Sequence, residues 1–122
     1  MEGGNAVDAA IGAALTACVA EPMHASLGGG GIAVVMPSGQ LPRAYDFLPR
    51  SPSRRKDPAE LDIEEVFLET LQPKTRVCIG PGSVAVPGLV AGLFRLHADL
   101  GYMPFAALAE PAVEYAKTGV VL

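Results

Sequence analysis

Residues 5–36 read NAVDAAIGAALTACVAEPMHASLGGGGIAVVM, a helix pattern followed by four glycines and a strand pattern. Asn5 is a favourable N-cap, and Asp8 completes a capping box with it. Apolar residues follow at the three-or-four spacing of one buried helix face, at Val7, Ile11, Leu15 and Cys18. Most remaining positions are Ala or Gly, so the helix can lie close to a neighbour. Pro22 ends it.

The four glycines at 28–31 lead into a predicted hairpin. Ile32–Met36 is an apolar run of strand length, suited to a sheet buried on both faces. The turn residues 37–40 follow, and Arg43–Phe47 returns as the second strand. A phosphate loop needs a strand before its glycines, a helix after them and usually a Lys. Here the order is reversed and no Lys follows, so we interpret the glycines as positions where a crowded backbone leaves no room for a Cβ.

The middle of the chain is rich in proline and charge. Residues 49–58 are basic and predict an exposed loop. Asp57 then caps a predicted acidic helix with a thin apolar face, formed by Ile63, Phe67 and Leu71. Beyond it, Arg76–Ile79 and Ser83–Val86 predict two short strands around the turn Gly80-Pro81-Gly82.

The last third predicts helices. Pro87 suits the first helical position, Gly101 ends the helix, and its buried stripe is Leu89, Leu93, Leu96 and Leu100. A short piece over residues 103–108 precedes a final helix from Glu110 to Thr118. Without strict alternation of strand and helix, the pattern predicts an α+β fold in a single domain or domain fragment over residues 1–122.

Composition excludes several classes of function. The chain has 122 residues, is 50% hydrophobic and carries a formal charge of −4, which argues against nucleic acid as a partner. Charged or turn-forming residues interrupt every long apolar stretch, so we expect no transmembrane segment. The opening residues run straight into the first helix, as though cut from a longer chain.

No residue cluster predicts a metal or cofactor. Cys18 and Cys78 match no ligand spacing and are expected to be free, small hydrophobic residues. His24 is expected in a loop and His97 on the surface, each without a second ligand nearby. The serines occupy no Gly-x-Ser-x-Gly elbow. Local chemistry alone therefore indicates a soluble α+β domain and does not reveal its role.

The order of the motifs points to a family. Gly3–Ala10 leads to Val19–Pro22, the glycine run, Tyr45-Asp46-Phe47, Val86-Pro87-Gly88 and finally Leu108–Ala112. This series resembles the front part of the large subunit of γ-glutamyltranspeptidases. The likeness covers nearly the whole chain, with residues 51–75 the least typical.

The resemblance implies an N-terminal-nucleophile hydrolase with a four-layer αββα sandwich. In that family one precursor cuts itself into a large and a small subunit, and the cut exposes a threonine. The threonine attacks a γ-glutamyl amide such as that of glutathione, and its own α-amino group serves as base. Backbone amides of a glycine pair hold the oxyanion, and water or an amine takes the acyl group. These groups belong to the small subunit, so the resemblance implies that this chain alone is inactive.

One substrate contact is expected here and is altered. In the family, an arginine directly after the Asp-Phe of the second hairpin strand binds the α-carboxylate of the substrate, for which its planar fork is suited. In this chain Leu48 stands there. Arg50 would lie on the same face of a continuing strand, displaced by about 7 Å, although Pro49 disfavours regular strand geometry. We therefore predict Arg50 as a displaced substrate anchor.

Three other interpretations remain open. Related acylases that remove side chains from β-lactams share the fold and offer a second enzyme activity. A non-catalytic, stand-alone remnant acting as a binding or assembly module is the alternative outside enzymes. Nucleotide binding at the glycine run is the third.

Overall fold

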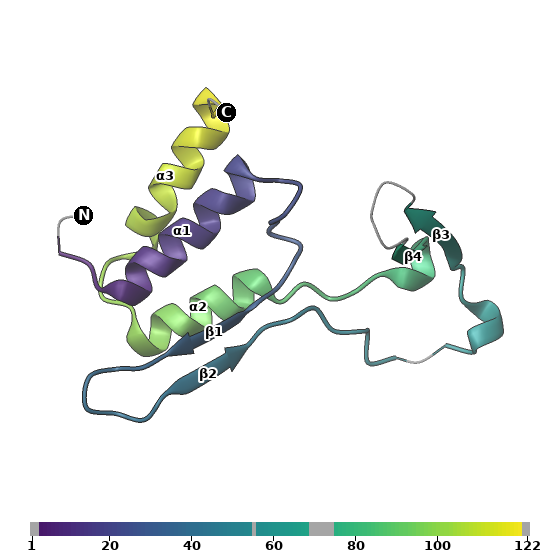
Figure 1. Ribbon diagram of the computed structural model, residues 1–122, viewed down its shortest axis with the longest axis horizontal. Coiled ribbons are helices and arrows are strands. Elements are labelled where there is room, and N and C mark those ends of the chain that lie inside the picture. Colours follow the sequence, from purple (N-terminus) through teal and green to yellow (C-terminus); the bar gives the residue numbers. More distant parts are fainter. Residues whose placement is uncertain (1–2, 55, 69–74, 121–122) are drawn as a thin grey trace. The chain divides into compact units, whose positions relative to one another are not determined.

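The computed structural model describes residues 3–54, 56–68 and 75–120 (Figure 1). It divides into two compact units: unit 1 comprises Met1–Pro49 and Pro87–Leu122, and unit 2 comprises Arg50–Val86. Both strand pairs are antiparallel and the helices are separate from them in sequence, so the α+β class is confirmed. The single domain over residues 1–122 stays a prediction.

Helix α1, Ala6–Ala20, begins with the expected capping box. Oδ1 of Asn5 accepts hydrogen bonds from the backbone N–H groups of Val7 (2.8 Å) and Asp8 (3.0 Å). Oδ2 of Asp8 in turn accepts from the N–H of Asn5 at 2.9 Å. The helix ends two residues before Pro22, as the sequence predicts.

Strands β1, Ile32–Val35, and β2, Arg43–Asp46, form the predicted hairpin in a register that pairs Ala33 with Tyr45. Ala33, Val35 and Tyr45 pack against the core of unit 1. The prediction of burial on both faces is wrong for this chain, because Ile32 and Val34 are 62% and 70% exposed. The helices of unit 1 cover the other face of the hairpin (Figure 1).

Helices α2, Leu89–Leu100, and α3, Phe105–Thr118, complete unit 1. Its buried core consists of Val7, Ile11, Leu89, Leu93, Leu96 and Leu108. Contrary to the prediction, Pro87 does not occupy the first helical position, because α2 begins two residues later, at Leu89, with Gly88 as its N-cap. The predicted break before Glu110 is also wrong: α3 runs through Pro111, because Leu108 and Ala112 are both buried on one face of a continuous helix.

Unit 2 corrects two predictions. The predicted acidic helix is instead the 3-10 turn η1, Pro58–Glu60, followed by strand β3, Glu64–Leu68. Strand β3 pairs with β4, Thr75–Ile79, along its whole length, and this backbone pairing replaces the hydrogen bonds of the predicted helix. Leu71 lies outside the described residues. Residues 81–83 form the 3-10 turn η2, so the strand predicted at Ser83–Val86 is reduced to one bridge between Val86 and Arg50.

A buried carboxylate ties α1 to the connection between α2 and α3. Asp8 is fully buried and accepts hydrogen bonds from the N–H groups of Tyr102 (3.0 Å) and Met103 (3.3 Å). The side-chain amide of Asn5 donates to the Leu100 carbonyl at 2.8 Å. Burial alone would raise the pKa of Asp8, but these backbone donors and the nearby His97 outweigh it and hold the pKa below its ordinary value.

Candidate functional site

The glycine run holds the end of β2 in place. Gly31 and Phe47 exchange backbone hydrogen bonds of 3.3 and 3.0 Å, which extend the hairpin pairing beyond β2. The carbonyl of Gly29 accepts from the N–H groups of Gly88 and Leu89, both at 3.0 Å, where α2 begins. A Cβ on Gly30 would strike the Phe47 carbonyl. Close backbone approach therefore accounts for Gly30, as the sequence interpretation expected.

Phe47 is held by glycines on α2 as well. A Cβ on Gly88 would collide with the carbonyl of Phe47, and a Cβ on Gly92 would overlap its ring near the Cβ and Cγ atoms. The ring also lies against Gly31, at 3.0 Å from the position of a Cβ there. Because the glycine run and α2 both pack on Phe47, the residue before position 48 is held tightly in place.

Leu48 stands where the family resemblance places an arginine. Its backbone N–H donates to Oδ1 of Asp46 at 3.1 Å, and its side chain is half-exposed. No cationic side chain therefore occupies position 48.

Arg50 is the first residue of unit 2. Strand β2 ends at Asp46, and the backbone of Arg50 pairs with Val86 through hydrogen bonds of 3.1 and 2.7 Å. Its role as a substrate anchor stays a prediction.

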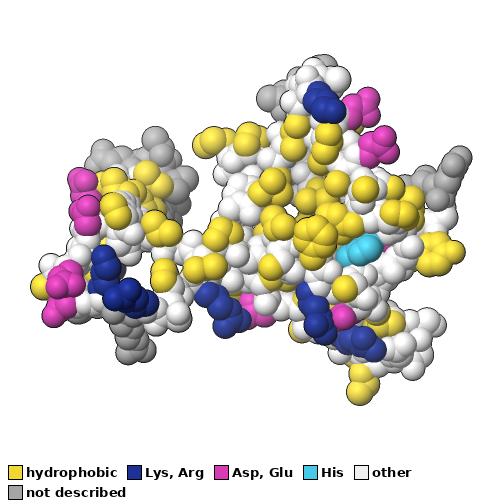
Figure 2. Space-filling model, turned by 180° about the vertical axis from the view of Figure 1, so that it is seen from behind, with side chains coloured by type: hydrophobic (Ala, Val, Ile, Leu, Met, Phe, Trp, Pro, Cys, Tyr) yellow, Lys and Arg dark blue, Asp and Glu magenta, His cyan; other side chains and the backbone are white. Residues whose placement is uncertain are grey.

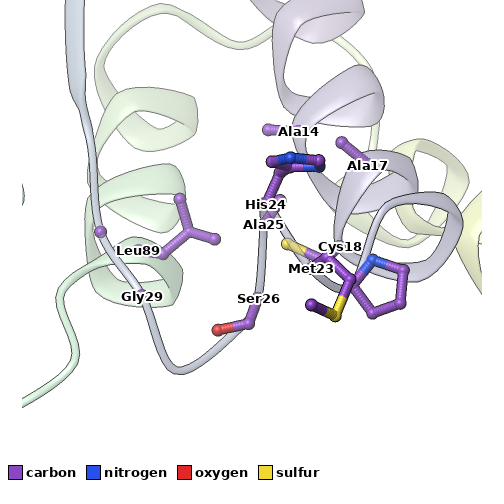
Figure 3. A pocket seen from close by; sticks show the side chains of 11 residues that line it. Ala14, Ala17, Cys18, Met23, His24, Ala25, Ser26, Gly29 and Leu89 are labelled. Carbon is purple, nitrogen blue, oxygen red and sulfur yellow. The ribbon is translucent and has the colours of Figure 1, made fainter. Parts of the chain in front are cut away.

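A cavity of about 420 Å³ lies in unit 1 beside the glycine run. In Figure 3, Ala14, Ala17 and Cys18 of α1 line one side of it, and Leu89 of α2 with Gly29 lines another. His24 and Ser26 lie on the segment between α1 and β1. The small side chains of α1 leave this space open.

The polar groups of this cavity show no activated nucleophile. Cys18 is free and half-buried, and burial raises the pKa of its thiol, which disfavours the reactive thiolate at neutral pH. His24 is an exposed loop residue, as expected, and its ring lies 4.0 Å from the Glu21 carboxylate. Within the described ranges no group of three or more His, Cys, Asp or Glu side chains could hold a metal ion.

The exposure of His97 differs from its prediction, and Cys78 is free as predicted. His97, expected on the surface, is half-buried, since its ring contacts the Met103 carbonyl at 2.7 Å and packs edge-on against Phe105. Cys78 is free and exposed on β4.

No helix in the described part of the chain is long and apolar enough to span a membrane.

The cavity itself could not be seen in the sequence. Cys18, His24 and Ser26 lie within nine residues of one another, but their spacing matches no recognised site motif. The only usable signal was indirect: small residues on α1 next to a glycine run predict close packing, yet they also leave unfilled space.

Comparison with known proteins identifies relatives along the whole chain. The chain is 34% identical over 117 residues to the glutathione hydrolase proenzyme of Pseudomonas aeruginosa, covering 96% of this chain and 20% of that protein. It is 32% identical over 127 residues to the Acylase ACY 1 proenzyme of Pseudomonas sp. strain V22, covering all of this chain and 22% of that protein. The chain thus spans about a fifth of the length of these curated relatives.

Solved structures agree. The gamma-glutamyltranspeptidase from Pseudomonas nitroreducens complexed with L-DON superimposes with a TM-score of 0.73 at 32% identity, covering 94% of this chain and 32% of that one. The expected fold is thereby confirmed: the chain is an α+β portion of an N-terminal-nucleophile hydrolase. The sequence model described as Gamma-glutamyltranspeptidase matches residues 1–122. The chain therefore belongs to the gamma-glutamyltranspeptidase family.

Proposed function

We propose that this chain is the front segment of the large subunit of an autoprocessed amidohydrolase and acyltransferase. The whole enzyme would cleave γ-glutamyl amides such as glutathione and transfer the γ-glutamyl group to water or an amine. The observation that carries the proposal is the family match over residues 1–122, together with a relative named glutathione hydrolase at 34% identity. The required partner is the remainder of the precursor.

In this proposal the chemistry belongs to the small subunit. Self-cleavage of the precursor frees the α-amino group of a threonine, and this group takes the proton from the threonine hydroxyl as it attacks the amide carbon. The tetrahedral oxyanion is held by backbone N–H groups, and its collapse expels the amine and leaves an acyl-enzyme. Water or a second amine then attacks the ester and releases the threonine. The present chain contributes scaffold and one wall of the acyl pocket, near the end of β2.

Arg50 is proposed as a displaced anchor for the α-carboxylate of the substrate. Its guanidinium can bind a carboxylate through two parallel hydrogen bonds and stays charged at all working pH values. The resemblance places the family arginine at position 48, and the support for the proposal is that Arg50 lies only two residues beyond it.

A second candidate activity is side-chain removal by a related acylase, such as those acting on β-lactams. Two observations favour it: the similarity to the Acylase ACY 1 proenzyme over all of this chain, and the leucine at position 48. An apolar residue there weakens selection for an acyl group that carries a carboxylate. Comparing the hydrolysis of γ-glutamyl-p-nitroanilide with that of pentanoyl-p-nitroanilide, whose acyl group carries no carboxylate, by the complete gene product separates the two activities.

The isolated 122-residue chain is predicted to be catalytically silent, because the proposed nucleophile belongs to the small subunit. The test measures release of p-nitroaniline from γ-glutamyl-p-nitroanilide by the purified chain and by the complete gene product. We expect no release above background from the chain. We expect turnover from the complete product after it divides into two polypeptides, the second with an N-terminal threonine detectable by mass spectrometry. Repeated turnover by the purified chain alone would overturn the proposal.

A further inference from the structure

Unit 2 contains a cavity that the proposed function does not use. Its volume is about 720 Å³, within the range of small-molecule sites. Its lining carries charges of both signs: Arg54 and Lys56 from the loop after Arg50, and Glu60 and Asp62 around η1. Figure 2 shows basic and acidic side chains on the same face of unit 2.

The four charged side chains are not paired with one another. Within the described residues no ion pair joins Arg54 or Lys56 to Glu60 or Asp62, although all four line one cavity. All four are exposed, so a ligand can reach them. Among the described residues, two positive and two negative groups leave the lining without net charge. A ligand with a single charge would therefore be attracted by one pair and repelled by the other.

Backbone hydrogen bonds fix the segments that carry these charges. The carbonyl of Asp62 accepts from Gly82 at 2.8 Å, which ties the acidic segment to η2. The carbonyl of Asp57 accepts from Glu60 at 2.9 Å and closes η1. The bridge between Arg50 and Val86 fixes the start of the basic loop. These contacts hold the backbone of the acidic residues in place and leave their side chains available. Ligand binding therefore does not have to order this part of the backbone, which lowers its entropic cost.

We propose that this cavity binds a small zwitterion, a molecule with both a carboxylate and an ammonium group. The guanidinium of Arg54 suits the carboxylate through paired hydrogen bonds, and Lys56 adds a second positive charge. The carboxylates of Glu60 and Asp62 accept hydrogen bonds from the ammonium group. The inference goes beyond the proposed function, since it assigns a ligand to residues with no part in the acyl transfer described above.

The test is calorimetric titration of the complete gene product with L-alanyl-L-alanine. Two blocked forms serve as comparison ligands: the N-acetyl dipeptide, which lacks the ammonium group, and the dipeptide amide, which lacks the carboxylate. We expect millimolar binding of the free dipeptide and binding about fivefold weaker or worse for each blocked form. Equal binding of all three, or none by the free dipeptide, overturns the proposal. A free dipeptide is also an amine acceptor in the proposed transfer reaction, so variants of the cavity are needed to decide which site binds it.

Variants assign the binding to this cavity. Arg54→Gln and Asp62→Asn should each weaken dipeptide binding about fivefold, whereas Lys117→Gln, an exposed cation on α3, should leave it unchanged. Neither Arg54 nor Asp62 has a side-chain hydrogen bond among the described residues, so both variants should fold, and a thermal melt checks this. Unchanged affinity in both cavity variants would show that the dipeptide binds elsewhere and would refute the assignment.

Discussion

At the scale of single residues, Asp8 makes the most demanding contacts in unit 1. It is fully buried and accepts backbone hydrogen bonds from Tyr102 and Met103, two adjacent residues of the connection between α2 and α3. In Asp8→Asn the amide group would face an N–H donor instead of accepting from it. We expect a loss of about 2 kcal/mol in the free energy of unfolding of the complete gene product, measured by urea denaturation at pH 6. Glu114→Gln, an exposed carboxylate on α3, is the control and should change little.

The same residue predicts a pH dependence. Because the folded-state pKa of Asp8 is lowered, the unfolded chain takes up a proton at a pH where the folded chain does not. The stability from Asp8 is therefore complete above the unfolded pKa of about 4 and is lost as pH falls through the folded pKa. The difference in stability between the native chain and Asp8→Asn should shrink between pH 5 and pH 2. A constant difference over that range would refute a lowered pKa.

Leu48 predicts a gain of function. In the complete gene product, Leu48→Arg should raise kcat/KM for γ-glutamyl-p-nitroanilide by about tenfold or more, because a guanidinium fork binds the substrate carboxylate. Leu48→Lys should help less, since an ammonium group lacks the fork, and Leu48→Met should not help. An unchanged kcat/KM in Leu48→Arg would exclude this role for position 48.

Arg50 can be tested in the same assay. If Arg50 anchors the substrate carboxylate, Arg50→Gln should lower kcat/KM about tenfold. The loss should be similar for glutaryl and γ-glutamyl substrates, since both carry a carboxylate at that end. Arg43→Gln, an exposed arginine on β2 that contacts Gln40, should have no effect. A similar loss in both variants would indicate a general charge effect.

At the scale of elements, α2 depends on the missing side chain at Gly92. A Cβ there would overlap the near part of the Phe47 side chain, which cannot move without displacing β2. We expect Gly92→Ala to lower the free energy of unfolding by about 2–3 kcal/mol, despite the better helix propensity of Ala.

The matched control for Gly92 is Gly12→Ala on α1. Its Cβ would meet only the Leu108 carbonyl, at 3.4 Å, so helix propensity should dominate and the stability should hold or rise slightly. Thermal unfolding of both variants makes the comparison. Equal effects would mean that the packing of Phe47 on α2 is not the decisive contact.

Elements with local signals were predictable from sequence. The capping box and apolar stripe fixed α1, and the leucine stripe of α2 gave Leu89, Leu93 and Leu96, all buried. The prediction of an acidic helix was wrong because Ile63 and Phe67 fit the spacing of a helix face. The pairing of β3 with β4 decides the structure instead, and a short stretch of sequence does not show it. The predicted break before Glu110 was wrong for a related reason: Leu108 and Ala112 are buried in the core, and that tertiary packing keeps α3 continuous.

The candidate site was predictable only in part. Leu48 at the arginine position and the steric role of Gly30 follow from the motif order and the glycine run. The crowding of Gly88 and Gly92 against Phe47 involves residues more than forty positions apart, and no local pattern reports it. The two cavities arise from three-dimensional packing and have no sequence motif of their own.

At the scale of the whole molecule, exposed apolar surface predicts the behaviour of the isolated chain. Ile32, Val34 and Met36 are 62%, 70% and 75% exposed, and Figure 2 shows apolar side chains gathered over unit 1. A chain that normally packs against further polypeptide should bind the dye ANS and show weak amide protection when purified alone. The complete gene product should not. A monomeric, well-protected chain would instead favour the stand-alone remnant.

The contacts of the first helix also bear on how the protein is made. Asn5 and Asp8 find their partners at Leu100, Tyr102 and Met103, more than ninety residues later. During translation the N-terminal helix emerges from the ribosome long before those partners are synthesised. Until then the Asp8 carboxylate must stay hydrated, so α1 cannot pack into the core of unit 1. Nascent chains that stop before Tyr102 should therefore depend on chaperones, and unit 1 should become stable only after its last helix has been synthesised.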